Sequence, residues 1–273
     1  MSAREPSVSP YALSKHRSEE AVRNASEGAP WLALRLPAIY GPGDMVTLDY
    51  FKIIRAGWAL EPRTDPPARA SLLYVDDAAA AILSAAESAA PGHIYEVGDE
   101  RQDGFAWSEI GAILSQTLNR RGRRVRLPRP LIAAYHGVLR RVERLSGRPP
   151  SVRTGQINEF FHPDWVARNN LLSDATSWRP ETPLSAGFAK TEDDDLVFHK
   201  ICSLLDPLND KGIKLTRETD LIADLEIDSV SVLDIVMDIE DNYDISIPVN
   251  TISEIKTIGE LVDAIHAIKK EQS

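Results

Sequence analysis

Two short residue patterns in this 273-residue sequence could carry chemistry. The first is Asp228-Ser229, which follows a loop rich in Asp and Leu and precedes an amphipathic segment with helical periodicity. A serine at the start of a helix lies near free backbone N–H groups and the positive end of the helix dipole, and both favour an attached phosphate. Asp and Ser are also favoured helix caps, so taken alone the pair is more often a cap than a modification site.

The second pattern is Tyr11-x-x-x-Lys15. Side chains at positions i and i+4 project from one face of a helix. A lysine ammonium beside the phenol favours the tyrosinate, so the tyrosine could exchange a proton with a carbonyl oxygen while a nicotinamide delivers hydride. In a chain with seven tyrosines one such match is unremarkable, and its meaning depends on the sequence that follows it.

Apolar runs and helical segments alternate after this pair. The run from Trp31 to Leu36 predicts a buried parallel strand, and it leads into "PAIYGPGD", which predicts a loop punctuated by Pro and Gly. Ligands of open α/β sheets bind at the carboxyl ends of the strands, where this loop would lie. The further elements predicted are a helix near 48–57, a strand at "SLLYV", an alanine-rich helix to about Ser88, a strand at "HIYEVG" and a helix near 106–118.

These segments resemble the extended short-chain dehydrogenase/reductases, the NAD-dependent epimerase/dehydratase family, over residues 6–190. The matching stretches, in the family's order, are Tyr11-x-x-x-Lys15, "LRLPAIYGPGD", "YVDDAAAAI", "IYEVGD" and "WRPETPLSAGF". The stretch "LPRPLIAAYHGVLRRVERLSGRPP" looks more like the 3β-hydroxysteroid dehydrogenase-like branch. The resemblance implies that Tyr11 is the catalytic acid/base and that Lys15 also binds the nicotinamide ribose of NAD or NADP. It further implies that a loop lies against the nicotinamide, formed by Pro37, Ala38, Ile39 and Tyr40.

Two parts of the family pattern are missing from the sequence. It contains no G-x-x-G-x-x-G, and Ser7 and Ser9 are too near Tyr11 to replace the family's catalytic serine or threonine. We therefore expect an α/β unit that is an incomplete Rossmann-type fold lacking its N-terminal strands. Removing central strands exposes backbone hydrogen-bonding groups and an apolar face. Whether the unit is an enzyme stays uncertain, and we expect residues 1–190 alone not to bind NAD(P) tightly.

Charge and composition divide the chain near Lys190–Thr191. Residues 191–273 hold 20 Asp+Glu and 7 Lys+Arg, a balance of −13, and residues 1–190 hold 21 and 24, a balance of +3, which together give −10. We predict an α/β domain over 1–190 and a separate domain over 191–273. The lack of a long apolar run or secretory signal and the single Cys202 predict a cytoplasmic protein, and no residue spacing predicts a metal site.

Helical periodicity dominates the acidic part. Apolar residues recur at helical spacing over 195–205, 230–243 and 258–268, and a short helix is expected around 251–255. Thr257 followed by Glu260 predicts a capping box at the start of the last long helix. The expected fold of residues 191–273 is an all-α bundle of four helices.

This part resembles an acyl carrier protein over about eighty residues. The matching features are Asp220-Leu221, Asp224-Leu225, Asp228-Ser229, Glu240, the aromatic Tyr243, "ISIP" and "TIGELV", with Val230 in place of the usual leucine. The resemblance implies that Ser229 carries 4′-phosphopantetheine, attached by a phosphopantetheinyl transferase. It also implies docking to basic patches of acyl-transferring or condensing enzymes, and the acidic side chains expected to dock are Asp228, Asp234, Asp238, Glu240 and Asp241.

An arginine-rich segment, "NRRGRRVRLPRP", precedes a helix with a one-sided apolar stripe. The stripe consists of Leu131, Ala134, Tyr135, Val138, Val142 and Leu145, with Arg140, Arg141 and Arg144 off it. We expect the stripe to face the core and the arginines to face solvent. Docking of the acidic carrier helix and contact with anionic lipid are the alternatives. Nucleic acid is not predicted, because the chain is acidic overall and has no nucleic-acid-binding motif.

Three functional interpretations follow. In the first, the chain works as an acyl carrier fused to a truncated NAD(P)-dependent reductase or epimerase of lipid or fatty-acyl metabolism. In the second, it is half of an active oxidoreductase that reduces a keto group on a carrier-bound or lipid substrate. In the third, the N-terminal part is a pseudoenzyme that serves as a docking scaffold.

Overall fold

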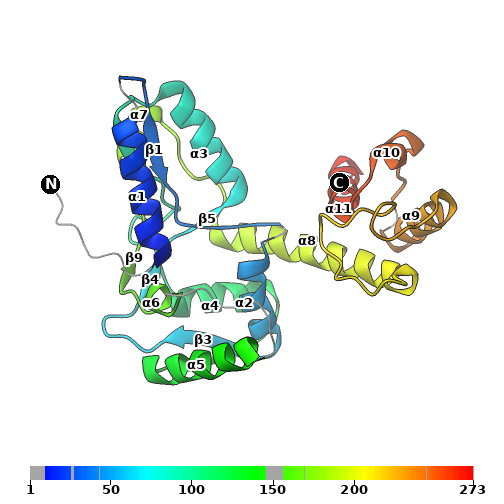
Figure 1. Ribbon diagram of the computed structural model, residues 1–273, viewed down its shortest axis with the longest axis horizontal. Helices are drawn as coiled ribbons and strands as arrows, with labels where there is room; N and C mark the ends of the chain where they lie inside the picture. The colour runs from blue at the N-terminus through cyan, green and yellow to red at the C-terminus, as the bar shows by residue number, and fades with distance from the viewer. Residues whose placement is uncertain are drawn as a thin grey trace. The chain divides into compact units, whose positions relative to one another are not determined.

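The computed structural model describes residues 10–25, 28–42, 44–145, 156–168, 170–243 and 245–272. The chain forms two compact units, Met1–Phe188 and Ala189–Ser273, which are described separately below (Figure 1).

The strands of unit 1 form parallel pairs. β1 (Leu32–Arg35) pairs with β6 (His93–Glu96), β2 (Ala38–Tyr40) with β5 (Leu72–Tyr74), and β3 (Trp58–Pro62) with β8 (Arg123–Leu127). A small mixed sheet has the order β7-β4-β9, formed by Phe105–Ala106, Arg69–Ala70 and Asp164–Trp165. The strands predicted at "WLALRL", "SLLYV" and "HIYEVG" are confirmed as β1, β5 and β6. The loop predicted at Pro37–Tyr40 was wrong in part, because Ala38–Tyr40 pairs with β5.

Seven helices of the described part of unit 1 accompany these strands. They are α1 (Pro10–Ala25), α2 (Met45–Arg55), α3 (Val75–Ser88), α4 (Trp107–Thr117), α5 (Arg129–Leu145), α6 (Gln156–Phe160) and α7 (Asn170–Thr176). The alanine-rich helix α3 buries Ala78, Ala81 and Ala85 against a core that includes Leu73 and Tyr95. Small side chains at this spacing let the helix pack closely on the neighbouring strands.

A second core cluster lies around aromatic residues of α2, β2 and α4. Phe51 and Ile54 of α2 are fully buried there, together with Ile110 and Leu114 of α4. Phe188 completes the cluster from α8 (Leu184–Leu205).

The prediction started the first carrier helix at Asp195, and this was wrong. α8 begins at Leu184 and continues to Leu205 without interruption. Apolar residues of α8 belong to the cores of both units. Leu184 and Phe188 pack in a core of unit 1, and Val197 and Ile201 pack in the core of unit 2.

The stripe expected to face the core lies on α5, and that expectation was also wrong. Leu131, Tyr135 and Val138 are 57%, 64% and 62% exposed. The side chains of Val142, Leu145, Arg140 and Arg144 lie outside the described residues. An amphipathic pattern shows that one helix face is apolar, but it does not show what covers that face.

Unit 2 is helical, as predicted. Besides the later part of α8 it contains a 3₁₀ turn (Asp206–Leu208), α9 (Ser229–Tyr243), α10 (Val249–Glu254) and α11 (Ile258–Gln272). The predicted capping box of α11 is confirmed, because the Glu260 N–H donates to Thr257 Oγ1 at 3.2 Å and the Thr257 N–H donates to Glu260 Oε2 at 3.0 Å. The buried core contains Val197, Ile201, Leu205, Leu221, Leu225, Ile227, Ile235, Val236, Ile239, Ile245, Ile247, Ile258, Leu261, Val262 and Ile265.

Across the described ranges, every helix is too short or too polar to cross a bilayer.

Candidate functional site

The start of α9 is capped by Asp228. Its Oδ1 accepts a 2.8 Å hydrogen bond from the Ser231 N–H, and its backbone carbonyl accepts the N–H of Val232 at 3.0 Å. Asp228 is exposed, and Ser229 is the first residue of the helix. The side chain of Ser229 lies outside the described residues. The cap of this helix is therefore the aspartate of the pair, and the serine occupies the first helical position.

The loop before α9 is built from alternating carboxylates and leucines. Asp220 Oδ1 accepts the N–H groups of Ile222 and Ala223 at 2.9 and 2.7 Å, and these hydrogen bonds lower the pKa of the Asp220 carboxyl. The Asp220 N–H donates to Asp224 Oδ2 at 2.9 Å. Leu221, Leu225 and Ile227 point into the core and anchor the loop. The Asp-Leu pattern thus fixes the turn that leads the chain to Asp228-Ser229.

Arg217 fastens the same loop to two helices. Its guanidinium contacts both carboxylate oxygens of Asp194 on α8 at 2.9 Å and Asp263 on α11 at 2.5 Å. Burial alone would raise the pKa of Asp194, but the His266 ring, with Nε2 3.5 Å from Asp194 Oδ1, and the Arg217 guanidinium outweigh it and lower that pKa. Sequence reasoning missed this network. A lone arginine in an otherwise arginine-poor acidic segment is the signal that could have indicated it.

The acidic residues of α9 have two kinds of surroundings. Asp234, Asp238 and Asp241 are exposed. Glu240 is only partly exposed, and its Oε1 accepts the Ile247 N–H at 2.6 Å, so it holds the segment after the helix. Leu233 and Met237, which precede Asp234 and Asp238 in sequence, are 46% and 62% exposed. This surface combines acidic and apolar side chains, as protein docking surfaces do.

A small apolar void lies in the interior of unit 2. Its volume is about 10 Å³, and its lining contains no polar residue. The lining residues are Leu221, Val232, Ile235, Val236, Ile252, Ile255 and Leu261, from the loop, α9, α10 and α11. An apolar void of this size holds no ordered water.

In unit 1, Tyr11 and Lys15 lie on α1, as predicted. Lys15 Nζ is 5.5 Å from the centroid of the Tyr11 ring, and the Tyr11 side chain is 50% exposed. α1 has no buried residue. The structure thus brings the two side chains together on a solvent-facing helix.

Glu19 and Arg35 connect α1 to β1. Arg35 Nε and Nη2 donate to the two carboxylate oxygens of Glu19 at 3.0 and 2.8 Å. This bidentate contact lowers the pKa of Glu19 and raises that of Arg35. Tyr11 precedes Glu19 by eight residues, about 12 Å along a helix. Figure 1 shows the N-terminal end of α1 toward the carboxyl end of β1, which is the ligand-binding side of such sheets.

The four residues expected to lie against the nicotinamide divide into two groups. Ala38 and Ile39 are exposed and Pro37 is partly exposed, whereas Tyr40 is 1% exposed. The Tyr40 ring packs edge-on against Tyr74 and Phe188, with centroid distances of 5.7 and 5.2 Å. Burial raises the pKa of Tyr40. Tyr40 is therefore a core residue in this structure, and the exposed part of the segment is Ala38-Ile39.

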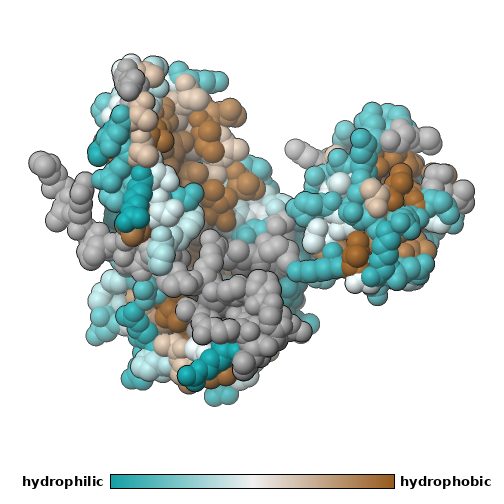
Figure 2. Space-filling view, viewed as in Figure 1, coloured by the Kyte–Doolittle hydropathy of each residue, from teal (hydrophilic) through white to brown (hydrophobic). Residues whose placement is uncertain are grey.

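The surface around α1 and α3 exposes apolar side chains. Val22 is 52% exposed, and Ile82 and Leu83 of α3 are 47% and 65% exposed. Figure 2 shows hydrophobic surface in the part of unit 1 where Figure 1 places α3. Exposed apolar surface was predicted for this unit, and these side chains agree with that prediction.

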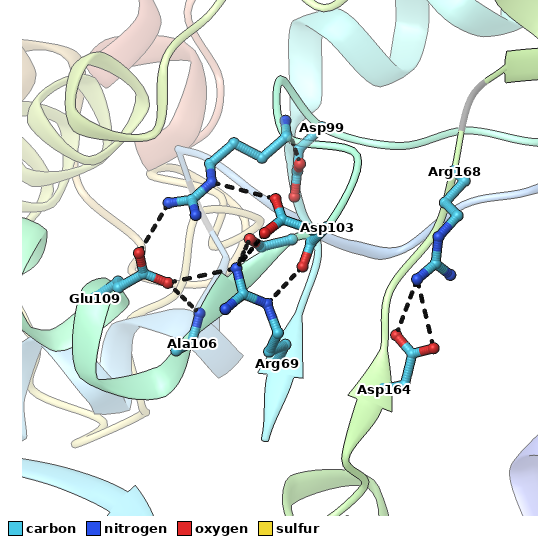
Figure 3. A network of polar contacts seen from close by, with 9 residues as sticks. Arg69, Asp99, Asp103, Ala106, Glu109, Asp164 and Arg168 are labelled. Atoms are coloured by element: carbon cyan, nitrogen blue, oxygen red, sulfur yellow. Dashed lines mark hydrogen bonds and ion pairs between the residues drawn. The ribbon is translucent and has the colours of Figure 1, made fainter. Parts of the chain in front are cut away.

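A polar network near α4, which sequence reasoning also missed, proves to be structural. Arg69 donates to Asp103 Oδ2 at 2.9 Å and to the Gly104 carbonyl at 2.8 Å (Figure 3). Arg101 Nη1 donates to Glu109 Oε1 at 3.0 Å, while Glu109 Oε2 accepts the Ala106 N–H at 2.7 Å. Each of these charged groups already has partners within the chain, so the network positions the start of α4 and leaves no obvious place for a ligand.

Comparisons with known proteins agree with the division of the chain into two units. Residues 199–265 match the phosphopantetheine attachment site family, and residues 2–98 match the NAD dependent epimerase/dehydratase family. The acyl carrier protein of Porphyromonas gingivalis is 36% identical over 62 residues, which are 23% of this chain and 80% of that protein. The ceramide reductase of Caulobacter vibrioides is 33% identical over 193 residues, which are 71% of this chain. The chain thus spans 59% of the length of that relative.

A solved structure shares the fold of unit 1. UDP-glucuronic acid 4-epimerase from Bacillus cereus, in complex with UDP-glucuronic acid and NAD, has a TM-score of 0.50 at 16% identity, covering 71% of this chain and 56% of that one. The phosphopantetheine attachment family implies a 4′-phosphopantetheine group, and the epimerase/dehydratase family uses NAD(P). The chain therefore belongs to the acyl carrier protein family through its C-terminal unit, which is fused to a region that matches the NAD dependent epimerase/dehydratase family over residues 2–98.

Proposed function

We propose that Ser229 carries the 4′-phosphopantetheine arm and that unit 2 holds acyl groups on it. The observation that carries this proposal is the start of α9, where Asp228 caps the helix and Ser229 is its first residue. The helix N-terminus favours the phosphate that joins serine to the arm. The interior between α9, α10 and α11 is lined by apolar side chains, an environment suited to an acyl chain.

Mass spectrometry after enzymatic loading tests the attachment site. The purified chain is incubated with coenzyme A and a phosphopantetheinyl transferase, and we expect the intact mass to increase by one phosphopantetheine. Ser229→Ala should abolish the increase. Ser231→Ala is the matched control, because Ser231 lies two residues further along the same helix. This variant should gain the mass of one phosphopantetheine, like the unmodified sequence. Loading of the Ser229→Ala variant would refute the assignment.

The exposed acidic residues of α9 support docking of this unit to basic surfaces of acyl-handling enzymes. Asp234, Asp238 and Asp241 are exposed, and complementary charge mainly accelerates association. Charge reversal at these three positions should slow loading by the transferase, most at low salt. The same reversal at Asp210, an exposed aspartate outside α9, should leave the loading rate unchanged.

A second candidate function is the reduction of a keto group on a long-chain lipid or acyl substrate. Tyr11 and Lys15 lie together on the exposed face of α1, and one relative is named ceramide reductase. The exposed Ala38-Ile39 segment and Tyr11 fit the nicotinamide end of a dinucleotide, which supplies hydride when bound. Tyr11 would donate the proton to the substrate carbonyl oxygen, with the Lys15 ammonium favouring the resulting tyrosinate.

Cofactor binding separates this second function from the first and from a docking scaffold. The full chain is titrated with NADH and NADPH, followed by nicotinamide fluorescence. Micromolar affinity, together with loss of keto-lipid reduction in Tyr11→Phe, would support the reductase. Because the sequence has no glycine-rich pyrophosphate motif, we expect weak binding, and the carrier function does not depend on the result.

A further inference from the structure

α5 presents a row of apolar side chains to solvent. Leu131, Tyr135 and Val138 are 57%, 64% and 62% exposed, and their spacing of four and three residues places them on one face. Ala134, between them, is exposed as well. Figure 1 shows α5 at the margin of unit 1. Single exposed leucines need no explanation, but a row on one helix face marks an interaction surface.

The segment that contains this helix is strongly basic. Residues 110–145 hold nine arginines and one acidic residue, Glu143, in a chain whose net charge is −10. The arginines are Arg120, Arg121, Arg123, Arg124, Arg126, Arg129, Arg140, Arg141 and Arg144. Arg124 and Arg126 contact Glu61 at 3.0 and 2.8 Å, so one carboxylate is shared between two cations. A local surplus of positive charge remains on this part of the surface.

We propose that α5 is an interfacial helix that binds unit 1 to the surface of an anionic lipid bilayer. The helix would lie in the plane of the headgroups, with Leu131 and Val138 inserted and the phenol of Tyr135 at the polar boundary. The arginine side chains would extend toward lipid phosphates. This surface belongs neither to the acyl carrier function nor to the proposed keto reduction.

A bilayer fits these observations better than a single acidic protein helix. The exposed arginines are distributed over three consecutive elements: Arg120 and Arg121 in the loop, Arg123, Arg124 and Arg126 in β8, and Arg129 and Arg141 in α5. Distributed charge suits a plane of headgroups, and the exposed apolar row lies along one face of α5, which could insert into such a plane.

Vesicle flotation with the full-length chain tests the proposal. Vesicles of phosphatidylcholine alone are compared with vesicles in which about a third of the lipid is phosphatidylglycerol. We expect the chain to float only with the anionic vesicles at low salt, and the bound fraction to fall when salt is raised to about 0.5 M. Equal binding to both kinds of vesicle, or binding to neither, would overturn the proposal.

Surface variants identify the helix. Leu131→Gln with Val138→Gln should lower partitioning to anionic vesicles at least about tenfold, since two exposed apolar groups no longer insert. Leu171→Gln is the matched control, because Leu171 is 65% exposed on α7, and it should bind normally. Far-ultraviolet circular dichroism establishes that each variant is folded. Unchanged binding of the double variant would contradict the proposal, as would self-association of the chain through α5 without vesicle binding.

Discussion

The buried carboxylate of Asp77 accepts a 2.9 Å hydrogen bond from the backbone N–H of Thr182, 105 residues further along the chain. The same carboxylate accepts the N–H of Glu181 at 3.3 Å. Asp77 stands at the start of α3 in "YVDDAAAAI", and the two N–H groups belong to "WRPETPLSAGF". Two stretches that carried the family resemblance are therefore joined directly in the structure.

Replacing Asp77 should destabilise unit 1. Asp77→Ala would leave two N–H groups without their acceptor, at a cost on the order of 1–3 kcal/mol in the free energy of unfolding. Asp76→Ala is the control, because Asp76 is exposed, and its effect should stay within about 0.5 kcal/mol. All five tryptophans lie in unit 1, so urea unfolding followed by tryptophan fluorescence reports on this unit. Equal midpoints for the two variants would contradict the prediction.

The start of α9 should respond differently to substitution at its two adjacent residues. Asp228→Ala removes the acceptor for the Ser231 N–H and should cost about 1 kcal/mol of stability in unit 2. Ser229→Ala should cost less, because the cap remains. Amide hydrogen exchange of α9 measures the difference, and faster exchange in Ser229→Ala than in Asp228→Ala would show that the cap is misassigned.

Acid should weaken unit 2 through Asp194. Its pKa is lowered in the folded state by His266 and Arg217 against the effect of burial, so the unfolded state binds the proton more readily. The resulting stabilisation is present above the unfolded pKa of about 3.9 and is lost as pH falls toward the lower folded value. Asp194→Asn should flatten the dependence of stability on pH below about pH 5. Thermal unfolding by circular dichroism at several pH values tests this, and an unchanged slope would refute it.

Cys202 should react slowly with alkylating reagents. Burial, followed by the charge of Asp206, raises the pKa of the thiol to about 11, and the thiolate is the reactive form. Iodoacetamide at neutral pH should label the folded chain much more slowly than the chain in urea. Mass spectrometry over time gives both rates, and equal rates would mean that Cys202 is not protected.

Local periodicity predicted most helices, whereas long-range packing decided what sequence reasoning missed. The capping box Thr257 to Glu260 and the strands at "SLLYV" and "HIYEVG" could be predicted because the residues that specify them are close in sequence. β8 was missed because three of its five residues, Arg123, Arg124 and Arg126, are charged and give no apolar strand pattern. Its pairing partner, β3, is more than sixty residues away in sequence. The contact between Asp77 and Thr182 has no local signal at all.

The sequence also predicted which face of a helix is apolar better than it predicted what packs against that face. The apolar stripe of α5 was recognised, but its exposure in the structure was not, because periodicity contains no information about neighbouring elements. At the carrier site the Asp228-Ser229 pair was found, while the assignment of the cap to the aspartate required the hydrogen bond to Ser231.

At the start of α9, Asp228 caps the helix, whereas Ser229 is the proposed attachment residue. Because Asp228 Oδ1 accepts the Ser231 N–H, esterification of the neighbouring hydroxyl, as proposed, would leave this hydrogen bond of the cap in place. An arm could then be attached and removed many times without the first turn of the helix losing its cap.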